Sequence, residues 1–402
     1  MSKILISSIG TGNIKKDSDE DYFDTKYIID GKEYEDSLTA KVLIHHYNID
    51  KVYFIGTNRS MWDNIYYYFN GKDDEFLDYL SSKKEAGIEK NDLSKIEKSL
   101  DEYLGSSKPS SKCLLIKYKE NSNEEIWNNF EKLLAISDQL EDGDEIYLDI
   151  THGFRYMPIL NIFLLEFLTL LNSNNIKIAG VFYGMYSENR SNIIDFKIFF
   201  DLLDWAKALS MLKNSSNALP LAMLLAKDSE NHEYEKIFLQ FGNNLQIANM
   251  ASLWQFIKNA NKKIKKLENS DNKIIRLISK KIYEIVNRLD KDTQSKFQYE
   301  LAVWLYENKN YALSYIALHE AIVTKACETK GYSVSDIKER EEAKKHIDAP
   351  YNKYFNTKYQ NSISQIRNNI AHQSMDRKNM VEQDIKKLVE FLEDFKSYFY
   401  QI

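Results

Sequence analysis

The sequence has little cysteine, no long apolar run and no excess of positive charge. Only Cys113 and Cys327 occur in 402 residues. That suits a reducing cytoplasm and gives neither a disulfide framework nor a metal signature. No apolar run approaches the roughly 20 residues that span a bilayer, and the N-terminus lacks the layout of a signal peptide. We therefore expect a cytoplasmic protein that makes no membrane contact.

The charge balance and two missing motifs exclude further classes. The formal net charge is −6, whereas proteins that coat nucleic acid are usually basic. Any RNA contact is expected to be local and brief, as in an enzyme. The basic run at 261–266 is interpreted as a solvated helix face. There is no G-x-x-x-x-G-K-[ST] phosphate loop, and the Gly-Thr-Gly at 10–12 is too short for a dinucleotide fingerprint.

Short, nearly continuous apolar segments in the first half are typical of strands buried on both faces. Helix candidates separate them, and this alternation predicts an α/β domain with a mostly parallel, doubly wound sheet over residues 1–200. The predicted strands are 3–10, 51–57, 112–118, 145–151 and 177–185, with a last one near 193–199, and the helix candidates are 36–48, about 60–105, 123–140 and 157–172.

The second half shows apolar residues at three- and four-residue spacing, which predicts an all-α region over 201–402. Residues 201–290 carry no recognisable motif and are interpreted as a possible connecting helical region. Residues 299–321 look like one helical hairpin of the tetratricopeptide kind. No second copy follows at a fixed period, so a solenoid is disfavoured.

Three polar loops follow predicted strands, at the edge of a parallel sheet where ligands bind. Any one of them is explained by ordinary turn chemistry, but three at one edge indicate a ligand site. The candidate binding residues are Gly10, Thr11, Gly12 and Asn13 in the first loop, Thr57, Asn58 and Arg59 in the second, and Thr151, His152, Gly153, Phe154 and Arg155 in the third.

The third loop is the most informative. Pro158 favours the first turn of a helix, so residues 151–157 should precede a helix N-terminus, which attracts anions. Gly153 allows close approach of the backbone, and Phe154 and Arg155 offer stacking or phosphate contact. Asp149 and His152 are two potential metal ligands, but a buried Asp149 that accepts hydrogen bonds from loop amides is the favoured reading. We predict no metal.

The segment Arg-Asn-Asn-Ile-Ala-His at 367–372 combines groups that cleave RNA without metal. His372 titrates near neutrality and serves as general acid or base, Arg367 supplies charged donors to the phosphate, and Asn368 orients the imidazole or binds a phosphate oxygen. The pattern also arises by chance in helices that pack an apolar stripe and expose polar residues.

Geometry favours two copies of this segment. Arg367 and His372 lie about 140° apart around a regular helix. A single Arg–His pair also supplies too few groups for a mechanism that uses both an acid and a base. Two chains across a twofold axis would supply two of each. The stripe of Ile363, Ile366 and Ile370 is a predicted dimer interface.

The three loops and the Arg-x4-His segment together resemble the CARF–HEPN ribonucleases of type III CRISPR systems. The most specific element is Asp-Ile-Thr-His-Gly-Phe-Arg at 149–155. The resemblance implies a Rossmann-like CARF sensor over 1–200 and a HEPN ribonuclease domain over 201–402. It also implies a homodimer that binds a cyclic oligoadenylate, made by the type III effector, through the three loops.

On this resemblance the activated dimer would cut single-stranded RNA through Arg367, Asn368 and His372, leaving 2′,3′-cyclic phosphate ends. The activator is expected to be cyclic tetra-adenylate, with the hexa-adenylate as the alternative, and no cofactor is expected for the chemistry. Glu320 would position the motif helix. The rival interpretations are a non-catalytic regulator gated by the same ligand and a HEPN toxin held by an antitoxin.

Overall fold

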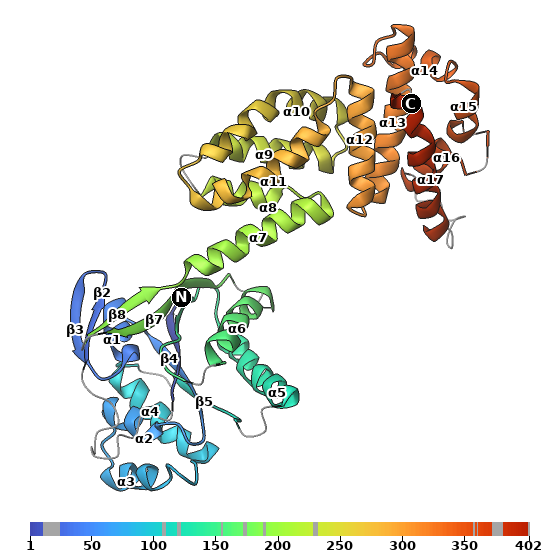
Figure 1. Cartoon of the computed structure of the whole chain (residues 1–402). Coiled ribbons are helices and arrows are strands. Elements are labelled where there is room, and N and C mark those ends of the chain that lie inside the picture. The colour runs from blue at the N-terminus through green and yellow to red at the C-terminus, as the bar shows by residue number, and fades with distance from the viewer. Residues whose placement is uncertain are drawn as a thin grey trace. The chain divides into compact units, whose positions relative to one another are not determined.

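In a computed structural model, the chain divides by its internal contacts into two compact units, Met1–Phe200 and Asp201–Ile402 (Figure 1). Each is described by itself. The structure describes residues 1–10, 25–106, 110–118, 122–153, 156–171, 175–187, 190–227, 232–356, 358–359, 361–371 and 381–400.

The first unit is built on an eight-stranded sheet of order β3-β2-β8-β7-β6-β1-β4-β5. Strands β5, β4, β1, β6 and β7 pair in parallel, and β8 runs antiparallel to β7. The predicted α/β fold is therefore confirmed. The strands are β1 Lys3–Ser8, β2 Thr25–Ile29, β3 Lys32–Asp36, β4 Lys51–Thr57, β5 Lys112–Ile116, β6 Glu145–Asp149, β7 Lys177–Ser187 and β8 Arg190–Asp195.

The helices of this unit cover both faces of the sheet, because alternate residues of each central strand point to opposite sides. Leu5 packs with α1, α2 and α4 on one face, and Ile4 and Ile6 pack with α5 and α6 on the other. The helices are α1 Thr39–Tyr47, α2 Trp62–Tyr68, α3 Asp74–Ser82, α4 Leu93–Tyr103, α5 Asn123–Leu134 and α6 Met157–Leu171.

Three details differ from the sequence-based expectation. The stretch 60–105 is three helices, because the chain turns at Asn70 and Gly87, both with positive φ. The last strand is Arg190–Asp195, and Ile198 already begins α7, so the predicted strand 193–199 is placed too late. The β2–β3 hairpin was not expected, although Asp30-Gly31, both with positive φ, is a favoured hairpin turn.

The second unit is all-helical among its described residues, as predicted, and its helices share one apolar core. Asn249, Asn272 and Thr293 cap α10, α11 and α12 by accepting backbone N–H bonds. The helices are α7 Ile198–Ser215, which begins at the end of the first unit, α8 Leu219–Ala226, α9 His232–Gln246, α10 Met250–Ile264, α11 Lys273–Leu289, α12 Gln294–Glu307, α13 Tyr311–Lys330, α14 Ile337–Lys344, α15 Ala349–Phe355, α16 Ile363–Ala371 and α17 Val381–Tyr400.

None of the helices in the described ranges is long and apolar enough to cross a membrane.

Candidate functional site

The three candidate loops leave neighbouring strands at the same edge of the sheet. Strand β1 lies between β6 and β4 and pairs in parallel with both. After β1 the chain passes through β2 and β3 and reaches β4 by way of α1, on one face of the sheet, whereas after β6 it reaches β7 by way of α6, on the other face. The connections after the neighbouring strands β1 and β6 therefore diverge at a switch point of the topology. In an open α/β sheet, that divergence leaves a crevice where ligands bind.

The β4 loop is tied to the β1 loop by hydrogen bonds. The Ser60 hydroxyl accepts the Thr57 N–H at 2.9 Å and donates to the Ile9 carbonyl at 3.1 Å. The Met61 N–H donates to the Gly10 carbonyl at 3.0 Å. These bonds fix the two loops relative to each other before any ligand arrives.

The three candidate residues of the β4 loop differ in what they can contact. Thr57 is only 4% exposed and its backbone and side chain hold the turn. Asn58 packs against Gly87, where a Cβ would lie 2.3 Å from its Nδ2. Arg59 has an exposed side chain, so it is the member of this loop best placed to meet an anion.

The β6 loop is organised by Asp149, which is fully buried. Its carboxylate accepts the Ser7 hydroxyl at 2.8 Å and the Thr151 N–H at 2.9 Å. The Thr151 hydroxyl oxygen accepts the Gly184 N–H at 2.9 Å. Asp149 therefore accepts a hydrogen bond from a loop amide, as the sequence predicted. The described residues contain no group of three or more metal-ligating side chains.

The end of this loop brings backbone close to the sheet. Gly153 has a φ of +111°, and a Cβ there would lie 2.9 Å from the Ser8 Cβ. Only glycine takes this conformation and this contact without strain. Helix α6 begins at Met157, with Pro158 in its first turn as predicted. The loop therefore leads into a helix N-terminus.

His152 lies in the same loop. Burial lowers the pKa of its imidazole, while the charge of Asp149 acts in the opposite direction. The net direction is downward, so the ring is neutral at pH 7. A neutral imidazole has one donor and one acceptor nitrogen, which suits a base edge or a sugar hydroxyl as well as a phosphate.

Six of the predicted site residues lie outside the described part of the chain. They are Thr11, Gly12, Asn13, Phe154, Arg155 and His372.

In the second unit, Arg367 and Asn368 sit on α16. The Arg367 guanidinium donates to the Asn368 amide oxygen at 3.1 Å, and Asn368 is exposed. The Arg367 Nε is buried and makes no hydrogen bond within the described residues. One N–H group of the Arg367 guanidinium is thus hydrogen-bonded to Asn368, while the Nε–H group has no hydrogen-bond acceptor among the described residues.

The isoleucine stripe on α16 does not have the predicted role. Ile363 and Ile366 are 0% and 1% exposed and belong to the core of their own unit. Only Ile370, at 38%, reaches the surface. The prediction of a dimer interface along this stripe is wrong, because the stripe packs α16 inward, with α13 among its neighbours.

Glu320 on α13 lies in a cluster of cations. Its carboxylate accepts a hydrogen bond from Arg340 of α14 and lies 3.3 Å from the His319 Nδ1. Burial acts to raise the pKa of this carboxyl, but His319 and the charges of Arg340 and Arg367 outweigh it and hold the pKa below its usual value. The sequence did not indicate Arg340, because no local pattern brings α14 to α13.

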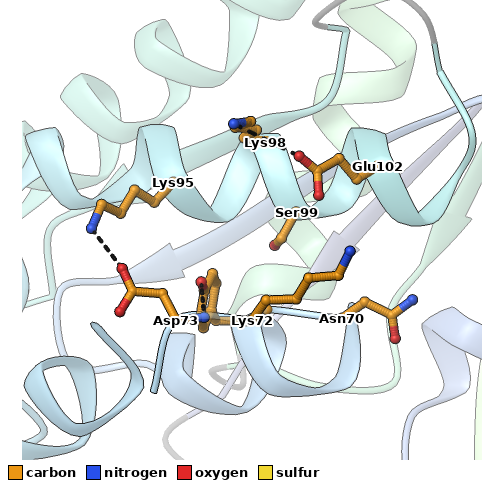
Figure 2. Close-up of a pocket in the computed structure, with 9 residues that line it drawn as sticks. Asn70, Lys72, Asp73, Lys95, Lys98, Ser99 and Glu102 are labelled. Carbon is orange, nitrogen blue, oxygen red and sulfur yellow. Dashed lines mark hydrogen bonds and ion pairs between the residues drawn. The ribbon is translucent and has the colours of Figure 1, made fainter. Parts of the chain in front are cut away.

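A separate cavity of about 360 Å³ lies beside α2 and α4 of the first unit (Figure 2). Lys95 pairs with Asp73 at 3.1 Å, and Lys98 lies 3.8 Å from Glu102. Two of the lysines that line the cavity are therefore paired with carboxylates. Four of its lining residues, 70–73, follow the end of α2, and none of the candidate residues of the strand-end loops lines it. We do not assign the candidate ligand site to this cavity.

Comparisons with known proteins match both units. The family described as CRISPR system endoribonuclease Csx1, CARF domain, matches residues 4–186, and the family described as CRISPR-associated protein MJ1674, second domain, matches residues 201–296. The CRISPR-associated protein MJ1674 of Methanocaldococcus jannaschii is 29% identical over 432 residues. That match covers 98% of this chain, which spans 66% of the length of the relative.

Among solved structures, Enterococcus italicus Csm6 bound to cyclic hexa-2′-fluoro-hexa-dAMP aligns with this chain. The alignment covers 100% of this chain and 95% of that one, with 14% sequence identity and a TM-score of 0.41.

Proposed function

We propose that the chain is a CARF–HEPN accessory protein of CRISPR systems and that it acts as a cyclic-oligoadenylate-activated endoribonuclease; the two family matches and the related CRISPR-associated protein support this. Residues 1–200 would be the sensor and residues 201–402 the HEPN ribonuclease, acting on single-stranded RNA as a homodimer. One observation carries the proposal. In the first unit, candidate ligand loops follow the neighbouring strands β6, β1 and β4 at one edge of the sheet, and in the second unit α16 carries Arg367 and Asn368.

The sensor loops suit a phosphodiester ring. The N-terminus of α6 and the glycine-containing loop before it offer backbone N–H groups to phosphates, and Arg59 offers a charge. A cyclic ligand with internal symmetry can contact the same loop in two copies of the chain. Gly10, Arg59, Thr151, His152 and Gly153 are the described residues that we assign to this contact, with cyclic tetra-adenylate as the ligand.

The proposed cleavage needs no metal. The 2′-oxygen forms a bond to phosphorus while the bond from phosphorus to the 5′-oxygen breaks, so a proton leaves the 2′-hydroxyl and another reaches the 5′-oxygen. Two copies of His372 would perform these two transfers, one as base and one as acid. Arg367 and Asn368 would bind the phosphorane oxygens. The product is a 2′,3′-cyclic phosphate.

Activation requires that the ligand bind the cutting state more tightly than the resting state. Moving an equilibrium from 1:99 to 99:1 takes a preference of about 10⁴-fold. A nuclease that damages its own cell gains from such a threshold, because basal cleavage stays low until the signal appears.

The test is RNA decay across a panel of cyclic oligoadenylates. The purified full chain should cut labelled single-stranded RNA weakly alone and strongly with cyclic tetra-adenylate. It should do so in the presence of a chelator. His372→Ala should abolish cleavage and keep ligand affinity. Cleavage that survives this change would refute the site, and RNA left intact under every ring tried would favour a non-catalytic regulator.

A further inference from the structure

Positive charge is concentrated on two adjacent helices of the second unit, α10 and α11 (Figure 1). Residues 250–290 contain ten Lys and Arg but only four Asp and Glu, so this segment carries a net charge of +6 in a chain whose net charge is −6. A solvated helix face usually alternates charges of both signs. An excess of one sign on an acidic protein indicates a local surface that attracts an anion.

Carboxylates neutralise part of this charge. Asp290 lies 2.7 Å from the Lys258 ammonium group, and Glu284 lies 2.7 Å from that of Lys281. We call the exposed lysines of the segment that make no ion pair with a described residue the α10–α11 basic face. Its members are Lys262, Lys265, Lys266, Lys273 and Lys280.

Three other charged residues lie close to this face in the sequence. Glu268 and Asp271 lie in the connection between α10 and α11 and reduce the net charge there. The Arg276 guanidinium donates to the Ser270 carbonyl at 3.4 Å, so Arg276 is not a member of the face. The five lysines outnumber the two carboxylates, and the surface stays positive.

The lysines of each helix share one side. Lys265 and Lys266 begin a short 3-10 helix that continues α10. They follow Lys262 by three and four residues, which is the spacing at which side chains on a helix are neighbours. On α11, Lys273 and Lys280 are two turns apart and therefore also lie on a common side.

Tyr283 joins the two groups of lysines. The Lys265 Nζ lies 6.0 Å from the centroid of the Tyr283 ring, and Tyr283 follows Lys280 by three residues on α11. The ring is partly buried against the core of the unit. Surfaces that bind single-stranded nucleic acid combine cations for the phosphates with aromatic rings for the bases. The α10–α11 basic face brings both together.

RNA fits this face better than an anionic membrane does. A helix that lies in a bilayer interface needs an exposed apolar side, whereas the apolar side of α11 is buried in the core and one large apolar residue of that helix, Leu277, is exposed. The lysines present separate point charges, which suit the phosphates of an extended strand.

We propose that the α10–α11 basic face binds the backbone of single-stranded RNA and holds the substrate while another part of the strand is cut. The inference rests on the proposed function, which assigns cleavage to α16. Within the second unit α11 packs on α12, α12 on α13 and α13 on α16 (Figure 1). The strand has to pass two helices to reach the cut, so the face serves long RNA and not short oligonucleotides.

The first test is the affinity of the full chain for an uncuttable, 2′-O-methylated RNA of about 20 nucleotides. The variant combines Lys262→Gln, Lys266→Gln and Lys280→Gln. Each phosphate contact adds about 0.7 to the slope of log affinity against log salt for single strands. The variant should therefore lose about 2 from that slope and bind about 100-fold more weakly at about 0.1 M salt.

The matched control removes the same charge outside the face. Lys213→Gln, Lys227→Gln and Lys236→Gln change exposed lysines of α7, the end of α8 and α9. This control should keep the affinity and the salt slope of the wild type, and thermal unfolding of all three proteins checks the fold. Equal losses in the two triple variants would show that net charge alone attracts the RNA, and would overturn the proposal.

The second test is RNA cleavage in the presence of the activating ring. The face variant should raise KM for the long RNA and leave kcat unchanged, because the face holds the bound substrate and the transition state equally well. A tetranucleotide bound at α16 should be cut equally by the variant and the wild type, because it does not extend to the face. A variant that cuts both RNAs more slowly at saturation would contradict this role.

The remaining outcomes separate this surface from the proposed function. Unchanged affinity and KM in the face variant would overturn the surface and leave the nuclease standing. Poly-glutamate, or vesicles that contain phosphatidylserine, binding through the same lysines as tightly as RNA would assign the face to a protein or a membrane instead. A wild type that binds RNA through the face but cuts none under any ring would contradict the proposed function and leave the surface standing.

Discussion

The two units hold their candidate sites in different ways. In the sheet unit, buried groups such as Asp149 and Ser60 tie the strand-end loops together through backbone hydrogen bonds. In the helical unit, Arg367 and Asn368 contact each other at the surface of α16. A site built from backbone depends on the shape of the chain, whereas a site built from side chains depends on individual functional groups. Substitutions should therefore act differently in the two units.

The largest effect is expected from removing one catalytic side chain. Arg367→Ala should lower the rate of activated RNA cleavage about 10² to 10³-fold, because one preorganised donor to the developing charge is worth that much. Affinity for cyclic tetra-adenylate should not change. Single-turnover cleavage and calorimetric titration of the same preparation measure both quantities.

Arg276→Ala is the matched control, since Arg276 is an exposed arginine of the same unit whose side chain donates a 3.4 Å hydrogen bond to the Ser270 carbonyl. It should cut RNA at the wild-type rate. Equal losses of cleavage rate in the two variants would mean that the overall charge of the unit, and not the Arg367 site, controls cleavage.

A smaller effect is expected from the backbone of the sensor. Gly153→Ala should weaken binding of cyclic tetra-adenylate by about 2 kcal/mol, or roughly 30-fold, because the added Cβ strains a positive-φ residue and meets Ser8. Gly105→Ala also adds a Cβ at a positive-φ glycine (φ +68°), but with no atom within 4 Å, and should leave affinity unchanged. If both alanines bind the ring equally well, this loop does not form the site.

The smallest effect should be a pH-dependent change in stability. The pKa of Glu320 is held below its usual 4.5 in the folded chain, so its carboxylate contributes stability above that pH and loses it as pH falls through the lowered pKa. Glu320→Gln should reduce the free energy of unfolding by roughly 1.5 kcal/mol at pH 7.

Urea titrations between pH 7 and 3 measure this difference, which should shrink below about pH 4.5. Glu284→Gln is the control, because the Glu284–Lys281 pair lies at the surface and is screened by solvent. A Glu320→Gln difference that stays constant with pH would show that packing, and not charge, is lost.

Much of the fold followed from the sequence because buried parallel strands leave continuous apolar runs such as Val52–Ile55. The β2–β3 hairpin was missed although its Asp30-Gly31 turn was a usable signal. An apolar stripe shows that a helix face is buried but not against what, which is why Ile366 was assigned to the wrong partner. Long-range contacts such as Arg340 with Glu320 leave no local pattern.

The most direct test of the central claim is one titration of His372→Ala against the wild type with cyclic tetra-adenylate, following ring binding and RNA cleavage together. The account predicts equal dissociation constants, with 2′,3′-cyclic phosphate products from the wild type and no cleavage by the variant. RNA cleavage by His372→Ala at the rate of the wild type would contradict the account. So would a failure of both proteins to bind the ring.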